Sequence, residues 1–128
     1  DEIKVVSDQY GCPTWSGDLA DGLAKIATHI EKNKGEIPWG TYHFCGRGYT
    51  TWHGFTEAIV EEAKEWESLQ VKRVTPISTE EFPTAAERPK WSVLDTSKIE
   101  ETFGITPLPW REGLHAMMNE LYRTSKKA

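Results

Sequence analysis

Short β-rich runs alternate with amphipathic helical segments through the first 78 residues of this chain. Residues 3–7 are extended, and a Gly-Cys-Pro-Thr turn at 11–14 leads directly into a helix. The apolar face of that helix recurs at spacings of three and four, at Leu19, Leu23, Ile26, Ala27 and Ile30. Residues 41–46 and 72–78 form two further extended runs. Because helices that alternate with strands cover the faces of a sheet, the pattern predicts an α/β fold.

The remaining expected elements are three helices and one long irregular segment. A second helix begins near Thr50 or Thr51, either of which can cap it, just as Ser16 or Asp18 can cap the first. Its buried stripe is predicted at Phe55, Ile59, Ala63 and Trp66. Residues 79–95 are expected to be irregular, and a short helix over 96–103 ends at Gly104. The last helix, over about 110–124, offers Leu114, Met117 and Leu121 to a core.

Composition limits the possible functions. With 128 residues the chain fits one domain, and its formal charge of −5 argues against a nucleic-acid partner, which normally needs a basic face. No apolar run approaches the length of a bilayer span, and the first residues do not resemble a signal peptide. Two cysteines are too few for a disulfide framework. We therefore expect a cytoplasmic protein with no membrane partner.

Three motifs suggest chemistry but have simpler explanations. The sequence GRGYTT at 46–51 lacks the third glycine of a dinucleotide-binding loop, so Thr50 or Thr51 is better explained as a helix cap. The spacing Tyr122-x-x-x-Lys126 matches that of a dehydrogenase pair, but no Ser or Thr partner accompanies it. His43 and Cys45 share a strand face without a second ligand pair. The sequence therefore predicts neither a catalytic residue nor a metal site.

Arg88 is the more informative residue of the irregular segment. Pro89 stiffens the backbone after it, and Trp91 and Ser92 follow closely. A guanidinium offers a planar fork of donors to a phosphate or carboxylate, and a nearby aromatic ring can flank a sugar or a base. The alternative is that Arg88 ties the long loop to the protein surface through backbone carbonyls. The residue types alone do not separate these two roles.

Four blocks in a fixed order carry a resemblance to a known family. They are VVSDQYGCPTWSGDLA, GTYHFCGRGYTTWHGFTEAIVEEA, RPKWSVLDTSKIEETFGI and PWREGLHAMM. In this order they resemble the C-terminal part of the dTDP-4-dehydrorhamnose reductases, a family of extended short-chain dehydrogenases. The resemblance runs from about Ile3 to Tyr122, which is nearly the whole chain.

The resemblance implies how this chain divides the work with the rest of such an enzyme. The family joins an N-terminal Rossmann domain, which binds NAD(P)H and carries the catalytic Tyr and Lys, to a smaller substrate-binding portion. Residues 1–128 then form that C-terminal portion, with few short strands covered by about four helices and with the Rossmann domain absent. The chain itself is expected to hold neither catalytic residues nor cofactor, and to be inactive alone.

The resemblance also implies which residues contact the substrate. The turn DQYGCPT matches a family turn that faces the cleft between the two parts, where Thr14 offers a hydroxyl or caps the helix. Arg88-Pro89 matches the family's Arg-Pro motif. We therefore predict substrate contacts at Tyr10, Gly11, Pro13, Thr14 and Arg88.

The reaction implied for the whole enzyme is reduction of the C4 keto group of dTDP-4-dehydro-L-rhamnose by NAD(P)H, giving dTDP-L-rhamnose. Two alternatives use the same scaffold: a non-catalytic module like the regulatory subunit of methionine adenosyltransferase, and an epimerase or dehydratase acting on another nucleotide sugar. The expected partners are a dTDP-sugar and the Rossmann domain. An exposed apolar face can also form a homodimer.

Overall fold

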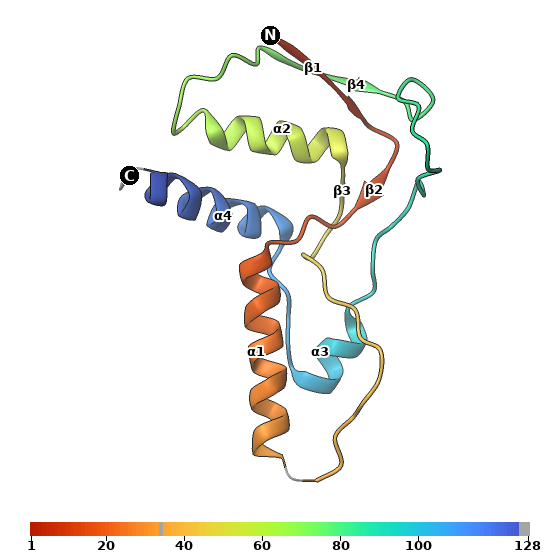
Figure 1. Cartoon of the computed structure of the whole chain (residues 1–128), viewed down its shortest axis with the longest axis vertical. Coiled ribbons are helices and arrows are strands. Elements are labelled where there is room, and N and C mark those ends of the chain that lie inside the picture. Colours follow the sequence, from red (N-terminus) through yellow and green to blue (C-terminus); the bar gives the residue numbers. More distant parts are fainter. Residues whose placement is uncertain (34, 126–128) are drawn as a thin grey trace.

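The computed structural model describes residues 1–33 and 35–125, which form two small sheets and four helices (Figure 1). The strands are β1 (Glu2–Val6), β2 (Tyr10–Gly11), β3 (Thr50–Thr51) and β4 (Arg73–Ile77). The helices are α1 (Ser16–Lys32), α2 (Trp52–Ala63), α3 (Ser97–Phe103) and α4 (Trp110–Ser125). The predicted α/β class, with few short strands and about four helices, is confirmed.

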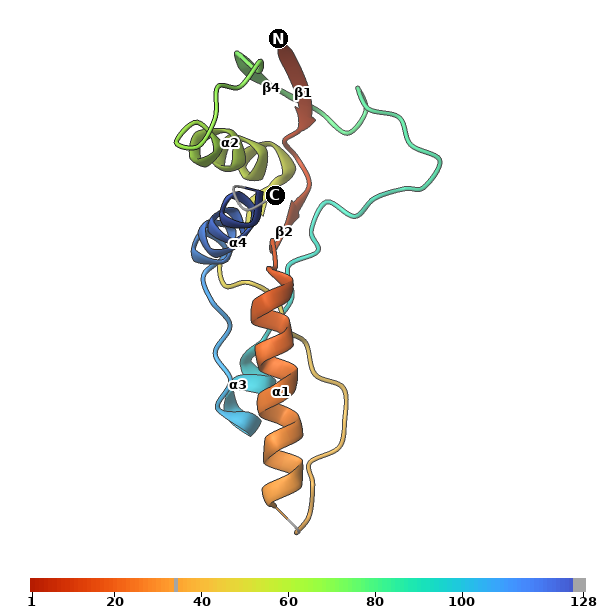
Figure 2. The ribbon, with the colours of Figure 1, turned by 60° about the vertical axis from the view of Figure 1, so that its left-hand side comes forward.

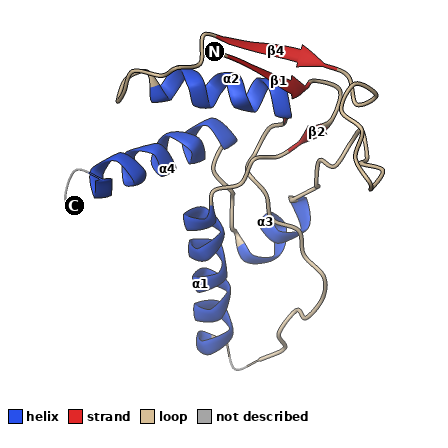
Figure 3. Cartoon of the chain, turned by 45° about the horizontal axis from the view of Figure 1, so that its top comes forward, coloured by secondary structure: helices blue, strands red, loops and turns tan. Residues whose placement is uncertain are grey.

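The first sheet joins the two ends of the predicted strand-and-helix region. Strands β1 and β4 pair in parallel, with Ile3 opposite Val74 and Val5 opposite Pro76. Pro76 lacks an N–H to donate, and it is accommodated because, within the described residues, β4 has only β1 as a neighbour. Helix α2 lies against this sheet (Figure 3). The extended runs predicted at 3–7 and 72–78 are thus confirmed within one residue at each end.

The strand predicted at 41–46 is wrong, because these residues pair with no strand in the part of the chain that the structure describes. Instead, Phe44 packs against α1, where a Cβ added to Gly22 would lie 3.0 Å from the Phe44 ring. The backbone N–H of Gly46 donates to the Thr14 hydroxyl at 3.1 Å. Pairing occurs a few residues later, where β3 meets β2 in an antiparallel ladder of two residues each. An extended run becomes a strand only when another strand lies beside it.

Helices α2 and α4 form the main apolar core. Its buried residues are Ala58, Ala63, Leu114 and Met118, and Phe55, Ile59, Trp110, Met117 and Tyr122 pack around them. Thr51 caps α2, as predicted, by accepting from the Gly54 N–H at 3.0 Å. Two predicted core positions are wrong. Leu121 is 50% exposed, and Trp66 lies in the turn beyond α2, where it stacks on Tyr122 at 5.2 Å.

Helix α1 extends away from the sheets with α3 beside it (Figures 1 and 2). Its predicted apolar face is only partly correct, because Leu19 and Leu23 are 38% and 59% exposed while Gly22 is buried. The predicted caps are wrong: Trp15 occupies the N-cap position without a side-chain bond. The Asp18 carboxylate instead accepts from the Leu108 N–H at 2.9 Å, which ties α1 to the segment before α4.

The segment 78–95 loops out on the side opposite α2 and α4 (Figure 2). It is irregular, as predicted, and its start is fixed where the Asp8 carboxylate accepts from the Thr79 N–H at 3.0 Å and hydroxyl at 2.7 Å. The short helix α3 then ends at Gly104 in a left-handed conformation, also as predicted. Lys126, the second residue of the Tyr122-x-x-x-Lys126 spacing, lies outside the described residues.

Within the described residues, none of the helices is both long enough and apolar enough to cross a membrane. The cytoplasmic location remains a prediction.

Candidate functional site

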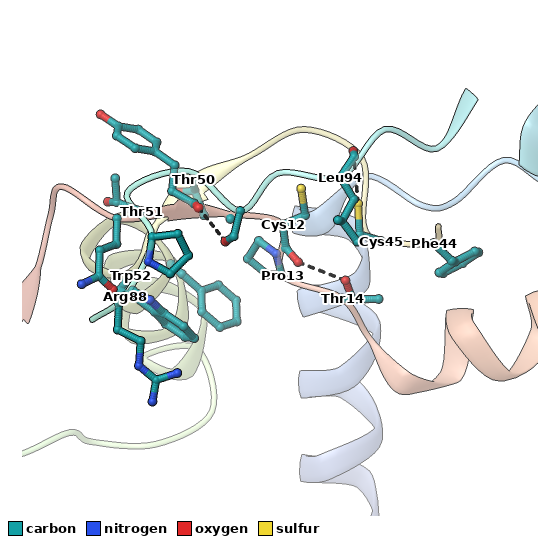
Figure 4. Close-up of a pocket in the computed structure, with 16 residues that line it drawn as sticks. Cys12, Pro13, Thr14, Phe44, Cys45, Thr50, Thr51, Trp52, Arg88 and Leu94 are labelled. Atoms are coloured by element: carbon teal, nitrogen blue, oxygen red, sulfur yellow. Dashed lines mark hydrogen bonds between the residues drawn. The ribbon is translucent and has the colours of Figure 1, made fainter. Parts of the chain in front are cut away.

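A cavity of about 600 Å³ opens where the turn after β1, the strand β3 and the segment before α3 meet. Figure 4 shows the side chains that line it. All five residues predicted to contact substrate are among them: Tyr10, Gly11, Pro13, Thr14 and Arg88. The structure therefore gathers two motifs that are far apart in the sequence around one cavity. Their roles in binding remain predictions.

The Arg-Pro segment reaches the turn through backbone pairing across 82 positions of sequence. The Tyr10 N–H donates to the Lys90 carbonyl at 2.9 Å, and the Tyr10 carbonyl accepts from both the N–H and the hydroxyl of Ser92. A Cβ added to Gly11 would lie 3.1 Å from the Ser92 hydroxyl oxygen, so the small residue keeps this approach close. These contacts hold Arg88 and Pro89 at the wall of the cavity.

Thr14 serves the protein itself rather than capping the following helix. Its hydroxyl donates to the Cys12 carbonyl at 3.0 Å and accepts from the Gly46 N–H at 3.1 Å. The prediction that Thr14 caps α1 is therefore wrong, because its hydroxyl fixes the turn and joins it to residue 46. The segments meet so closely there that a Cβ on Gly46 would lie 2.2 Å from the Pro13 carbonyl oxygen.

The Arg88 guanidinium is exposed and unpaired at one end of the cavity. It makes no hydrogen bond or ion pair with any residue in 1–33 or 35–125. The alternative role, in which Arg88 ties its loop to backbone carbonyls, therefore finds no support. In Figure 4 the side chain lies on the Trp52 side of the cavity, away from Cys45. An unpaired guanidinium at this position is suited to an anionic group such as a phosphate.

Three aromatic rings gather beside the turn, and no local pattern in the sequence marks them as a group. The ring centroids of Tyr10 and Trp91 lie 5.6 Å apart, those of Tyr49 and Trp91 lie 5.1 Å apart, and those of Tyr10 and Tyr49 lie 6.1 Å apart. Tyr10 is 38% exposed, and the other two rings are each 56% exposed. The rings come from three separate segments, so only the fold brings them together. We call Tyr10, Tyr49 and Trp91 the aromatic cluster.

The two cysteines near the cavity differ in exposure. Cys12 is half-buried and Cys45 is buried. Burial raises the pKa of the Cys45 thiol to about 11, and a hydrogen bond with Cys12 adds to the shift. Cys45 is therefore mostly protonated at neutral pH, and its thiol is less readily ionised than that of an ordinary cysteine. Among the residues that the structure describes, no group of three or more His, Cys, Asp or Glu side chains is placed to hold a metal ion.

The residues around the cavity are suited to ligand binding. An unpaired cation, exposed aromatic rings and a rigid turn can hold and orient a ligand that carries phosphate and ring systems. The loop 46–51, considered above as a nucleotide-binding loop, uses Thr51 to cap α2.

Comparison with known proteins gives a consistent family assignment. The family described as "RmlD substrate binding domain" matches residues 1–123. A dTDP-4-dehydrorhamnose reductase of Burkholderia thailandensis is 39% identical over 129 residues, covering 94% of this chain and 42% of that protein.

Solved structures agree with the sequence matches. A dTDP-4-dehydrorhamnose reductase from Clostridium acetobutylicum superposes with a TM-score of 0.80 at 37% identity, covering 94% of this chain and 39% of that one. The enzyme from Bacillus anthracis, solved in complex with NADP, gives a TM-score of 0.77 at 36% identity, covering 94% of this chain and 38% of that one. The chain thus spans about two fifths of the length of the relatives it matches.

Proposed function

The chain belongs to the RmlD substrate-binding-domain family, and we propose that it is the part of a dTDP-4-dehydrorhamnose reductase that holds the nucleotide sugar. The whole enzyme would reduce the C4 keto group of dTDP-4-dehydro-L-rhamnose to give dTDP-L-rhamnose. The names of the relatives support a reductase over the regulatory-subunit and epimerase alternatives. Residues outside this chain would bind NAD(P)H and carry the catalytic Tyr and Lys.

The observation that carries the proposal is the Arg88 guanidinium at the wall of the cavity beside the turn, which has no hydrogen-bond or ion-pair partner among the described residues. A nucleotide sugar has three parts, and the cavity together with the aromatic cluster beside it has a feature for each; of the cluster, Tyr10 lines the cavity itself. The diphosphate binds Arg88 through charge-assisted hydrogen bonds. The thymine ring stacks on the aromatic cluster, whose Trp91 lies only three residues after Arg88. The hexose lies over the turn at Gly11 and Pro13.

The contribution of this chain to the reaction is positioning. When bound, NAD(P)H supplies the hydride, and that chemistry belongs to the cofactor. Arg88 and the turn fix the sugar in one orientation, with its keto group facing the cofactor. This lowers the entropic part of the activation barrier. The rigidity comes from the Thr14 and Ser92 hydrogen bonds described above. By this account the chain alone turns over no NAD(P)H.

The test is calorimetric titration of dTDP-L-rhamnose into the chain and into Arg88→Ala. A hydrogen bond to a charged group contributes about 1.5–3 kcal/mol, so affinity is expected to fall roughly tenfold to a hundredfold. Thymidine lacks the diphosphate and should bind both proteins equally weakly. The matched control is Arg123→Ala, an exposed arginine in the last turn of α4. Equal affinity of wild type and Arg88→Ala for dTDP-L-rhamnose would contradict the proposal.

The exposed rings around the cavity also bear on the partners of the chain. Besides the aromatic cluster, Trp52 is 59% exposed and Leu94 is 44% exposed. We propose that the NAD(P)H-binding part of the enzyme covers this face, and that a homodimer covers it when that part is absent. Light scattering should then find dimers, or an apolar dye should bind. A monomer that binds no dye would argue against an uncovered interface.

A further inference from the structure

The only two cysteines of the sequence lie together at the cavity, although they are separated along the chain. Cys45 is 5% exposed and its thiol points to the Leu94 carbonyl at 3.8 Å. Cys12 is the neighbouring side chain whose hydrogen bond and charge act on the Cys45 thiol. Figure 4 shows both sulfur atoms on the same side of the turn.

The backbone on both sides of this pair is already fixed. The Thr14 hydroxyl bridges the Cys12 carbonyl and the Gly46 N–H, at 3.0 Å and 3.1 Å. A disulfide needs Cα atoms within about 7 Å and Cβ atoms that face each other. The segments 12–14 and 45–46 are in contact, and the two cysteine side chains are near enough to act on each other.

We propose that Cys12 and Cys45 form a reversible intramolecular disulfide when the chain meets a peroxide, and that this bond locks the turn at the cavity. The pair does not depend on the proposed function, since its formation is measured without a nucleotide sugar.

The different exposure of the two cysteines sets the order of the steps. Cys12 lies at the cavity wall and is the thiol that a small oxidant reaches first. Its thiolate attacks one peroxide oxygen, the O–O bond breaks, and the departing hydroxide takes a proton to become water. Cys12 is then a sulfenic acid.

The buried Cys45 completes the reaction. Its sulfur attacks the Cys12 sulfur, the S–O bond breaks, and the hydroxide that leaves takes the Cys45 proton as the second water. Two thiols have lost two electrons in total, and one peroxide has become two waters. A dithiol reverses the reaction by thiol–disulfide exchange.

The test treats the folded 128-residue chain with hydrogen peroxide and follows free thiols and intact mass. We expect both thiols to disappear, a mass loss of two hydrogens, and a cross-linked peptide that joins residues 12 and 45. Dithiothreitol should restore both thiols. The oxidised chain should also unfold at a higher temperature, because the bond restricts the unfolded state.

Three controls make the result specific. Cys45→Ser should stop at a Cys12 sulfenic acid, which dimedone traps, and Cys12→Ser should react slowly because only the buried thiol remains. In urea the intramolecular bond should form about tenfold more slowly or worse, because the fold no longer holds the thiols together. Two persistent thiols after peroxide treatment, cross-links only between chains, or equal rates in urea and in buffer would each overturn the proposal.

Discussion

The helix pair α2–α4 and the cavity wall are held together by different forces. Between the helices, Ala58, Ala63, Leu114 and Met118 are all at most 5% exposed and exclude water from an apolar core. At the cavity wall the large rings are exposed, and hydrogen bonds between distant segments hold the backbone in place. One region gains its stability from apolar burial, and the other has its shape fixed by polar contacts.

This difference separates stability from ligand contact. Apolar burial contributes about 25 cal/mol per Å² and does not depend on direction, so the four buried residues of the helix pair stabilise the chain without lining the cavity. Hydrogen bonds contribute less net free energy, but they fix directions. Changes in the helix pair should therefore affect unfolding most, and changes at the cavity wall should affect unfolding less.

The largest effect is expected from Leu114→Ala in the helix pair. Leu114 is 4% exposed, so truncation leaves a cavity and should lower the free energy of unfolding by about 2–5 kcal/mol. Urea denaturation measures this, with Leu121→Ala as the matched control, since Leu121 is on the same helix and 50% exposed. If both variants lose the same free energy of unfolding, the buried α2–α4 core does not contribute more to stability than an exposed position on the same helix.

An intermediate effect is expected from Gly46→Ala at the cavity wall. The new Cβ would lie 2.2 Å from the Pro13 carbonyl oxygen, so the backbone must shift, at a cost of about 1–3 kcal/mol. Gly35→Ala is the matched control, because among the described residues no atom beyond its chain neighbours lies within 4 Å of its added Cβ. The same urea experiment gives the comparison. A Gly46→Ala protein as stable as Gly35→Ala would mean that residues 13 and 46 do not touch.

The smallest effect is a change in acid sensitivity at Asp8. The hydrogen bond from Thr79 lowers the pKa of the Asp8 carboxyl below its ordinary value of 3.8. A lowered folded-state pKa contributes stability that is present above pH 3.8 and is lost as the pH falls below it. In Asp8→Asn the side chain at position 8 no longer takes up a proton. The stability of this variant should therefore fall less than that of the wild type between about pH 5 and about pH 2.

Thermal unfolding at a series of pH values measures this difference. Asp21→Asn, an exposed position on α1, serves as control and should follow the wild type. If the unfolding temperature of Asp8→Asn falls with acid as steeply as that of the wild type, the hydrogen bond from Thr79 to Asp8 does not make stability depend on pH.

The sequence predicted those parts of the fold that depend on neighbours along the chain. The Thr51 cap and the Gly104 end of α3 need only residues within one helical turn, and both were found. Phe55, Ile59 and Ala63 of the α2 stripe were predicted for the same reason, since helical periodicity can be counted from residue to residue, whereas Trp66 falls beyond the end of the helix. The motifs of the cavity, DQYGCPT and Arg88-Pro89, were also visible in the sequence.

The wrong predictions concern residues whose structure depends on a segment far away in the sequence. Residues 41–46 have strand-forming side chains, but no strand lies beside them. Leu19 and Leu23 have helical spacing, yet the structure places nothing over them that buries them. The sequence allows the Thr14 hydroxyl to cap α1, but in the structure this hydroxyl accepts from the Gly46 N–H at 3.1 Å instead. No local pattern contains this information.

The sequence by itself determined the family, the α/β class, most element boundaries and the candidate contact residues. Only the tertiary structure placed Tyr10, Tyr49 and Trp91 in one cluster, and only it brought Arg88, Cys12 and Cys45 to one cavity. The physical reason is that secondary structure follows from interactions within a few residues, whereas a binding site depends on contacts that exist only after the chain has folded.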